Sequence, residues 1–372
     1  MTQPERIAKG MYWDQAWSLV EGCTPISPGC DHCWAASQAH VRAGQKNPKI
    51  RARYEGLTTD KGKWNGQIRL LTNNLGAPLR RRKPIVYAVW NDLFHEDAPD
   101  EFIDRAFAVM ALSPEHTFLV LTKRPDRMRE YIQRLTGDVG SFGLPEPIDE
   151  VIFWPGLLCH SIRMRDGWKQ IPADYDGPDL VTPEEWVWTG EGKPFSWPLP
   201  NVFCGVTAEN QETANKRIPI LLQIPAAVRF ISVEPMLGPV DLSEGMCERG
   251  WWCDYCQATK SPQQVTYDEL CTYCGGSVEW KEQIDWVICG GETGPGARPM
   301  HPDWARSLRD QCKAAGVSFF FKQRGEWYPD RKGIYEGDSA IFGNTVVHRI
   351  GKKAAGRLLD GVECNEMPGV SR

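Results

Sequence analysis

The stretch "HTFLVLTKRPDRMREYIQRL" (116–135) decides the fold class of this chain of 372 residues. Its first half, 116–125, is a short apolar run that predicts a buried strand. Its second half, 126–135, spaces its apolar residues like one face of a helix. A strand followed directly by a helix is the repeating unit of a parallel sheet.

The same unit recurs along the chain. Because strands alternate with helices over six or seven units, we expect an α/β fold, a full or partial (β/α) barrel with parallel strands rather than an open sheet. The other strands are expected at 84–94, 201–210, 228–237, 284–294 and 317–327, and the other helices at 31–44, 101–113, 211–224 and 303–316.

Two segments break this alternation and are interpreted as insertions. The resulting division of the chain is an N-terminal half of the barrel with a cysteine loop at 1–137, a Pro- and Trp-rich insertion at 138–200, barrel strands at 201–242, a small zinc-ribbon insertion at 243–283, C-terminal barrel strands at 284–327, and a Gly-rich tail at 328–372. We expect this tail to cap the domain loosely.

The composition excludes several classes of function. The net charge is -5, so any contact with nucleic acid must use a local basic patch. We find no apolar run of 18 residues and no secretory signal in "MTQPERIAKGMYWDQAW" (1–17), and therefore expect a cytoplasmic protein without a membrane span. Thirteen cysteines in a reducing compartment point to metal ligands or catalytic groups rather than disulfides.

Four cysteines form the strongest local motif. Cys253, Cys256, Cys271 and Cys274 have the spacing C-x2-C-x14-C-x2-C, which is close to that of a ribbon binding tetrahedral zinc. An auxiliary iron–sulfur cluster is the alternative, because four thiolates hold that group as well. Neighbouring Trp and Tyr residues either pack around the metal or stack on nucleic-acid bases.

Three further cysteines lie in "GCTPISPGCDHCWA" (22–35): Cys23, Cys30 and Cys33. Three thiolates can hold three irons of a cubane [4Fe–4S] cluster and leave the fourth iron open. An open iron can bind S-adenosylmethionine and pass it an electron, and the cleavage gives a carbon radical. The alternative is a three-thiolate zinc site completed by His32 or His40.

The chain resembles a phage and prophage family that is named for its three-cysteine motif and has no assigned function, a divergent branch of the radical S-adenosylmethionine superfamily. The resemblance covers most of 12–327 apart from the insertions, and it is carried by "GCTPISPGCDHCWA", "NDLFHE", "FLVLTKRP", "GVTAEN", "RFISVEPMLGPVDL" and "DWVICGGETGPGARPMHPDWARSLRDQCKAAGVSFFFKQRGEW". It implies a [4Fe–4S] cluster on Cys23, Cys30 and Cys33, and an electron donor such as flavodoxin or ferredoxin. One departure is that six residues, rather than three, separate Cys23 from Cys30.

The resemblance also implies that strand ends bind the cofactor, as in barrels in general. Lys123 or Lys322 would then pair with the carboxylate of S-adenosylmethionine, and Glu209 or Glu234 would accept from its ribose hydroxyls. The alternative is that these residues are only the polar ends of buried strands. The full set of expected cofactor-binding residues is Asn91, Asp92, Thr122, Lys123, Thr207, Glu209, Asn210, Glu234, Glu292 and Lys322.

Two cysteines on strands could donate hydrogen to a substrate radical, but alternation argues against this role. If Thr207 and Glu292 point into the barrel, then Cys204 and Cys289 point outwards, because successive strand side chains face opposite sides. We therefore expect both to be small packing residues.

Basic clusters at 46–53 and 80–83 make a nucleic acid or nucleotide a plausible substrate, although each is also consistent with a solvated patch. The predicted function is that of a radical S-adenosylmethionine enzyme acting on such a substrate, in phage DNA modification or repair. A non-enzymatic zinc-dependent nucleic-acid-binding protein is the alternative. A metal-dependent hydrolase is a weaker one, because few His residues, among them His95, His160 and His301, lie on suitable loops.

Overall fold

A computed structural model of the whole chain describes residues 3–89, 91–136, 198–246, 250–253, 255–256, 258–260, 264–266, 269–330 and 335–368. Almost all of the expected Pro- and Trp-rich insertion, 138–200, lies outside these residues. His160 lies outside them as well.

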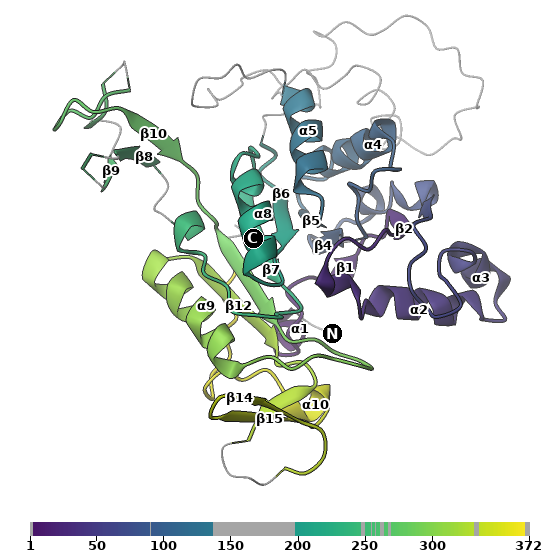
Figure 1. Cartoon of the computed structure of the whole chain (residues 1–372). Coiled ribbons are helices and arrows are strands. Elements are labelled where there is room, and N and C mark those ends of the chain that lie inside the picture. Colours follow the sequence, from purple (N-terminus) through teal and green to yellow (C-terminus); the bar gives the residue numbers. More distant parts are fainter. Residues whose placement is uncertain are drawn as a thin grey trace, which may run out of the picture.

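The centre of the fold is a sheet of seven parallel strands (Figure 1). From edge to edge these are β1 (Gln15–Ala16), β4 (Val86–Val89), β5 (Thr117–Thr122), β6 (Val202–Thr207), β7 (Val228–Val233), β11 (Trp286–Gly290) and β12 (Ser318–Gln323). The spatial order follows the chain order without a reversal, so the sheet curves one way into a half-barrel. The expected partial barrel of parallel strands is confirmed.

The helices that follow the strands cover the convex face of this sheet (Figure 1). They are α4 (Asp100–Ala111), α5 (Pro125–Thr136), α8 (Gln211–Leu222) and α9 (Pro302–Ala315). Each matches a helix expected from the periodicity. Within the described ranges, no helix is both long and apolar enough to cross a membrane.

Alternating strand residues divide the core into two layers. The larger layer lies between sheet and helices and contains Cys204 and Cys289, both buried. The expected packing role of these two cysteines is confirmed. Burial raises the pKa of Cys204 to about 12, and it also raises the pKa of Cys289. These thiols are therefore small apolar groups.

The smaller layer fills the bottom of the half-barrel with aromatic side chains. Tyr12 packs edge-on against Trp286, with ring centroids 5.4 Å apart, and against Phe320 at 5.3 Å. Such edge-to-face geometry is favourable between aromatic quadrupoles. The concave face thus has an apolar floor, and its open space lies above this floor at the carboxyl ends of the strands.

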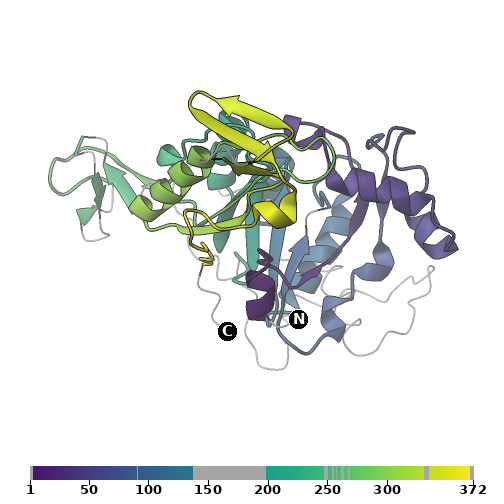
Figure 2. The same ribbon diagram turned by 90° about the horizontal axis from the view of Figure 1, so that it is seen from below.

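An arm leaves the sheet between β1 and β4 and lies on the side opposite the ribbon described next (Figures 1 and 2). It contains the strand pair β2 (Val20–Gly22) and β3 (Ile68–Leu70) with helices α2 (Trp34–Ala43) and α3 (Pro48–Tyr54). The remaining short helices are α1 (Gln3–Ile7) and the 3-10 turns η1 (Pro28–Cys30), η2 (Thr72–Asn74), η3 (Pro78–Arg80) and η4 (Ser243–Met246).

The second cysteine cluster lies on a separate small sheet that stands away from the half-barrel (Figure 1). Its order is β10 (Val278–Lys281), β8 (Gly250–Cys253), β9 (Ala258–Lys260), and both pairings are antiparallel. A small buried cluster around Cys253, Cys271 and Val278 is its only apolar core among the residues described there. Such a core needs a further cross-link, which agrees with a metal-binding insertion.

The tail is packed more tightly than we expected. After α9 and β12 it forms β13 (Trp327–Pro329), β14 (Ser339–Phe342), β15 (Thr345–Arg349) and α10 (Lys352–Ala355), with the sheet order β13-β15-β14. Its last part runs beside β12, where the Phe321 amide donates to the Cys364 carbonyl at 3.0 Å. The tail therefore covers the edge of the sheet that would otherwise have unpaired backbone groups.

Gly205 on β6 offers a test of packing in the smaller, aromatic layer of the core. A Cβ at this position would lie 2.4 Å from the Phe230 ring, so Gly205→Ala should destabilise the fold by about 2 kcal/mol through overpacking. Chemical denaturation measures the loss. The double variant Gly205→Ala/Phe230→Leu should recover part of it, and equal stability of Gly205→Ala and wild type would contradict the proposed contact.

Candidate metal and cofactor site at the strand ends

A cavity of about 480 Å³ opens at the carboxyl ends of the parallel strands. This volume lies in the range of small-molecule and cofactor sites. It is lined by the three cysteines of the N-terminal loop, by one residue of the tail, and by the ends of β5, β6, β7, β11 and β12. The cysteines and charged residues among them are Cys23, Cys30, Cys33, Asp92, Lys123, Glu234, Glu292, Lys322 and Lys352.

The three-cysteine loop begins where β2 ends. Gly22 has φ +92°, and a Cβ there would lie 2.1 Å from the Gln67 carbonyl, so only glycine fits this turn. Cys30 ends the single turn η1, and Cys33 directly precedes α2. All three cysteines line the same cavity.

Lys123 gives Cys30 a distinct electrostatic environment. Its Nζ lies 3.5 Å from the Cys30 Sγ. Burial opposes ionisation, but the Lys123 ammonium and hydrogen bonds within the loop lower the pKa of Cys30 below its usual value. For Cys23, burial and the Asp92 carboxylate raise the pKa to about 12, although Arg124 Nη1 lies 4.0 Å away. Cys30 is thus the more readily ionised of these two thiols.

A buried carboxylate fixes the middle of the loop. Glu209, which follows β6, accepts from Ser27 Oγ at 2.6 Å, from Lys123 Nζ at 2.5 Å and from Arg217 Nη1 at 2.9 Å. Burial opposes its ionisation, but the two cations hold the pKa of the carboxyl below its ordinary value. A Cβ at Gly29 would lie 2.4 Å from Glu209 Oε1, so the loop approaches this carboxylate as closely as its backbone allows.

A second carboxylate fixes the far end of the loop. Glu292, just beyond β11, accepts from Arg298 Nη2 at 2.6 Å and lies 3.2 Å from His32 Nδ1. The same Arg298 guanidinium donates to the Pro28 carbonyl at 2.9 Å. Burial opposes ionisation of Glu292, but the hydrogen bonds from Arg298 and His32 keep its pKa low. The loop is therefore attached to the sheet through β11 as well as β6.

Arg124 attaches the start of the loop. It donates to the Thr24 carbonyl at 3.1 Å and also pairs with Asp92 and with Glu96. His95 Nε2 lies 2.9 Å from the Thr24 hydroxyl. Residues that follow four different strands thus hold a single loop, so the cysteines are positioned by the sheet and not by the loop alone.

The cavity lining also contains two ammonium groups and a carboxylate that the strand end of β12, the tail and the end of β7 supply. Lys322 Nζ lies 3.2 Å from Glu234 Oε1, and the Tyr12 hydroxyl donates to Glu234 Oε2 at 3.3 Å. Lys352 approaches from α10 in the tail. Burial and the Lys322 charge lower the pKa of Lys352. These groups can bind an anionic group through the lysines and a hydroxyl group through Glu234.

Most of the expected cofactor-binding residues gather at this cavity. Two do not line it. Glu209 instead accepts hydrogen bonds from Ser27, Lys123 and Arg217. Asn210 caps α8, where its Oδ1 accepts from the Thr213 amide at 3.0 Å. The expected residues in the lining are Asn91, Asp92, Thr122, Lys123, Thr207, Glu234, Glu292 and Lys322.

Several residues of the site were not singled out from the sequence. Trp34 and Trp64 line the cavity from the arm, and Lys352 lines it from the tail. Arg124 and Arg298 hold the loop through contacts between distant segments. Arg124 directly follows Lys123 and Trp34 directly follows Cys33, so adjacency to predicted residues was a usable signal for two of the five. Nothing local marks Lys352, which a tertiary contact brings to the site.

The expected histidine ligands have other roles in the structure. His32 contacts Glu292, and His40 Nδ1 lies 3.2 Å from the Thr58 hydroxyl. His95 holds the loop, and His301 caps α9 by accepting from the Asp303 amide at 3.0 Å. In the described part of the chain, none of them joins a group whose ligand atoms all lie within 4.8 Å of one another.

The four cysteines of the small sheet do form such a group. Their ligand atoms all lie within 4.8 Å of one another. The Sγ atoms of Cys253 and Cys274 are 3.5 Å apart, and those of Cys256 and Cys271 are 3.8 Å apart. Four thiols this close can hold a metal ion such as zinc.

Fold and site define an α/β half-barrel protein with a three-cysteine loop over the carboxyl ends of its strands and a separate group of four cysteines that could hold a metal ion. Residues 8–368 match the family model described as "Protein of unknown function (DUF5131)", and the chain belongs to that family. No curated protein matches the chain, and no solved structure does.

Removing the charge of Glu209 should loosen the loop. Glu209→Gln leaves the buried Arg217 and the half-buried Lys123 without their carboxylate, so we expect it to lower the free energy of unfolding by about 3 kcal/mol at neutral pH. Because the pKa of Glu209 is lowered in the folded state, its contribution is complete above the ordinary pKa of 4.5 and is lost as the pH falls through the lowered value. The two proteins should therefore converge in acid.

Urea denaturation at several pH values measures this difference. Glu212→Gln is the matched control, because Glu212 pairs with Lys216 on the exposed surface of α8. An exposed pair of this kind contributes little to the free energy of unfolding. A loss in Glu209→Gln that is independent of pH between neutrality and strong acid would contradict the assigned ion pairs.

Proposed function

We propose that this protein is a radical S-adenosylmethionine enzyme that acts on a nucleic acid or nucleotide. Cys23, Cys30 and Cys33 would hold a [4Fe–4S] cluster with one open iron. The observation that carries this proposal is the convergence of three thiols from one loop on a cavity at the carboxyl ends of parallel strands. A small electron carrier such as flavodoxin or ferredoxin would supply the reducing electron.

The residues present fit such a cluster. Its thiolates bind separate irons, so their sulfurs stand further apart than those around one ion. The three loop cysteines agree with this, because they are absent from the groups of described residues with all ligand atoms within 4.8 Å. Lys123 and Arg124, which approach Cys30 and Cys23, would offset part of the negative charge of the thiolates.

The long spacing between the first two cysteines also has a physical explanation. The six residues between Cys23 and Cys30 include Thr24 and Ser27, which are the contacts of Arg124 and Glu209. The extra length therefore carries the attachment of the loop to the sheet. A cluster held by these cysteines would supply the electron for reductive cleavage of S-adenosylmethionine.

Other residues of the cavity lining would bind the rest of S-adenosylmethionine. Lys322 and Lys352 are suited to its carboxylate, and Glu234 is suited to its ribose hydroxyls. Glu209, the other carboxylate expected for the ribose, accepts from Ser27 and two cations and would position the loop instead.

For the four-cysteine group we propose zinc over an auxiliary cluster. Zn–S bonds of about 2.3 Å in a tetrahedron place neighbouring sulfurs about 3.8 Å apart. The sulfur separations of 3.5 Å and 3.8 Å on the small sheet agree with a single tetrahedral ion. The zinc would stabilise an insertion whose own apolar core is small.

Anaerobic reconstitution with iron and sulfide tests the cluster. The wild type should bind about four irons per chain, absorb in the visible range and form 5′-deoxyadenosine when dithionite and S-adenosylmethionine are added. Cys30→Ala should lose most of the iron and all of the product. Cys204→Ala, a cysteine buried behind the sheet, is the matched control and should retain both. Equal iron in wild type and Cys30→Ala would overturn the assignment.

The zinc site is tested by metal analysis of the protein as purified. We expect about one zinc ion per chain, because four thiolates complete its coordination. Cys271→Ala should release the zinc and lower the melting temperature, whereas Cys30→Ala should retain it. Iron in place of zinc at this site would support the auxiliary cluster.

The second candidate function is that of a non-enzymatic, zinc-dependent nucleic-acid-binding protein. It is favoured by two aromatic side chains exposed next to the metal ligands, Tyr255 (84% exposed) and Tyr273 (69% exposed). This candidate predicts a colourless protein that contains zinc alone, and the reconstitution above separates the two.

A further inference from the structure

We infer that a single-stranded nucleic acid lies across the mouth of the cavity, held on one side by a basic arm (residues 34–69) and on the other by α10. This inference rests on the proposed function for the chemistry that follows binding. The binding itself needs neither iron nor S-adenosylmethionine, so it can be tested separately.

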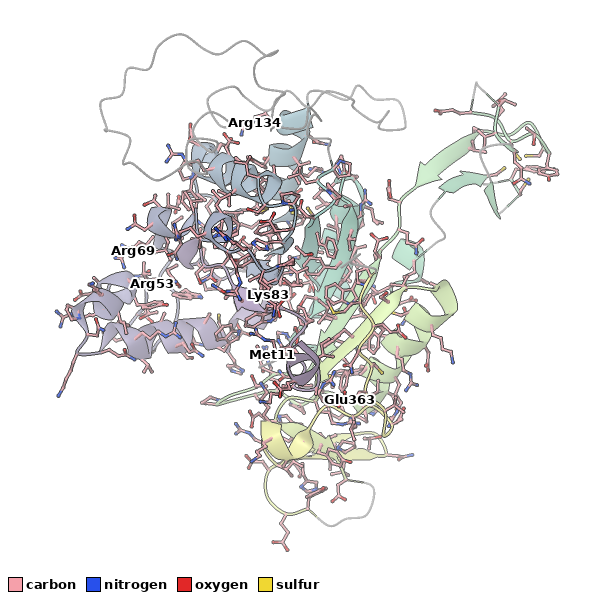
Figure 3. The ribbon with its side chains drawn as sticks, turned by 180° about the vertical axis from the view of Figure 1, so that it is seen from behind. Met11, Arg53, Arg69, Lys83, Arg134 and Glu363 are labelled. Carbon is pink, nitrogen blue, oxygen red and sulfur yellow. The ribbon has the colours of Figure 1, made fainter. Side chains whose placement is uncertain are left out.

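The charge of the arm is opposite to that of the whole chain. Residues 34–69 hold eight Lys and Arg against two Asp and Glu, a surplus of six positive charges in a protein of net charge -5. Arg53 and Arg69 mark this side of the molecule in Figure 3. A local surplus of this size on a negative protein is the electrostatic footprint of a polyanion site.

The cations of the arm fall into two groups. Arg53 pairs with Glu21, Arg42 donates to the Tyr54 hydroxyl at 2.8 Å, and Arg69 donates to backbone carbonyls, so these three hold the arm together. The others are exposed and form no ion pair within the described ranges. They are Lys46, Lys49, Arg51, Lys61 and Lys63.

Two tryptophans join the arm to the cavity. Trp34 is 58% exposed, and Trp64 is half-buried; both line the mouth. A large aromatic face left in water at the entrance of a basic site is suited to stacking on a base. Phosphate contacts on the arm and stacking at the mouth together favour a nucleic acid over an acidic protein.

Cations also reach the cavity from the tail. Lys352 lines the cavity, and Lys353 follows it on the exposed surface of α10. The arm and α10 come from distant parts of the chain (Figure 1), and residues of both line the cavity. A strand that spans the mouth of the cavity would place one base above the cysteines. A paired base could not reach them without leaving its stack, which favours single-stranded substrate.

Fluorescence anisotropy with a labelled single-stranded 20-nucleotide oligomer tests the inference on zinc-loaded protein without added iron. The triple variant Lys46→Gln/Lys49→Gln/Arg51→Gln should bind at least tenfold more weakly. It should also reduce the magnitude of the slope of log K against log salt concentration by about 2, because each phosphate contact on a single strand contributes about 0.7 to that slope. Trp34→Ala should weaken binding about tenfold with an unchanged salt slope.

The matched control removes three exposed cations at the amino end of β4: Arg81→Gln/Arg82→Gln/Lys83→Gln should bind like the wild type. Equal losses in both triple variants, no loss in Trp34→Ala, or duplex bound as tightly as single strand would each overturn the inference. Failure of iron reconstitution with these binding results intact would overturn the proposed enzyme alone, and normal 5′-deoxyadenosine formation without binding would overturn the inference alone.

Discussion

The carboxylate of Glu209 is completely buried where the cysteine loop, the sheet and the helix layer meet. Ser27 belongs to the loop, Lys123 follows β5 and Arg217 lies on α8, and all three donate to it. A buried carboxylate is tolerated only while such partners surround it, so the three elements are stabilised against one another through this carboxylate. The distance between loop and sheet follows from this cluster, and the shape of the cavity follows from that distance.

The half-barrel separates apolar residues at its bottom from charged residues at the carboxyl ends of its strands. The aromatic floor around Tyr12, Trp286 and Phe320 excludes water from the bottom, and the charged residues that follow the strands are collected at the rim. Because the rim is partly sheltered, its charges occur as pairs, such as Lys322 with Glu234 and Arg298 with Glu292. Each pair has a member that contacts the loop or the cavity, so the interactions that stabilise the rim also shape the site.

The parts that could be predicted from the sequence are those with local periodicity or spacing. Apolar runs followed by helical periodicity predict the strands and helices, and the C-x2-C spacing predicts the four-cysteine group. The alternation of strand side chains predicts that Cys204 points away from the cavity. The edge strand β1 has two residues and no pattern. Arg298 and Lys352 act across long separations that only the folded chain reveals. Glu209 was recognised as part of the site, but its role depends on Ser27 and Arg217, which a strand-end rule does not identify.

The tail that runs beside β12 also determines when the cavity can exist. Cys23 lies well before Lys352 in the chain, and the cavity lining includes both. Because translation proceeds from the amino end, Lys352 is synthesised long after the cysteine loop. The lining of the cavity is therefore complete only once α10 has been made and has folded against the half-barrel.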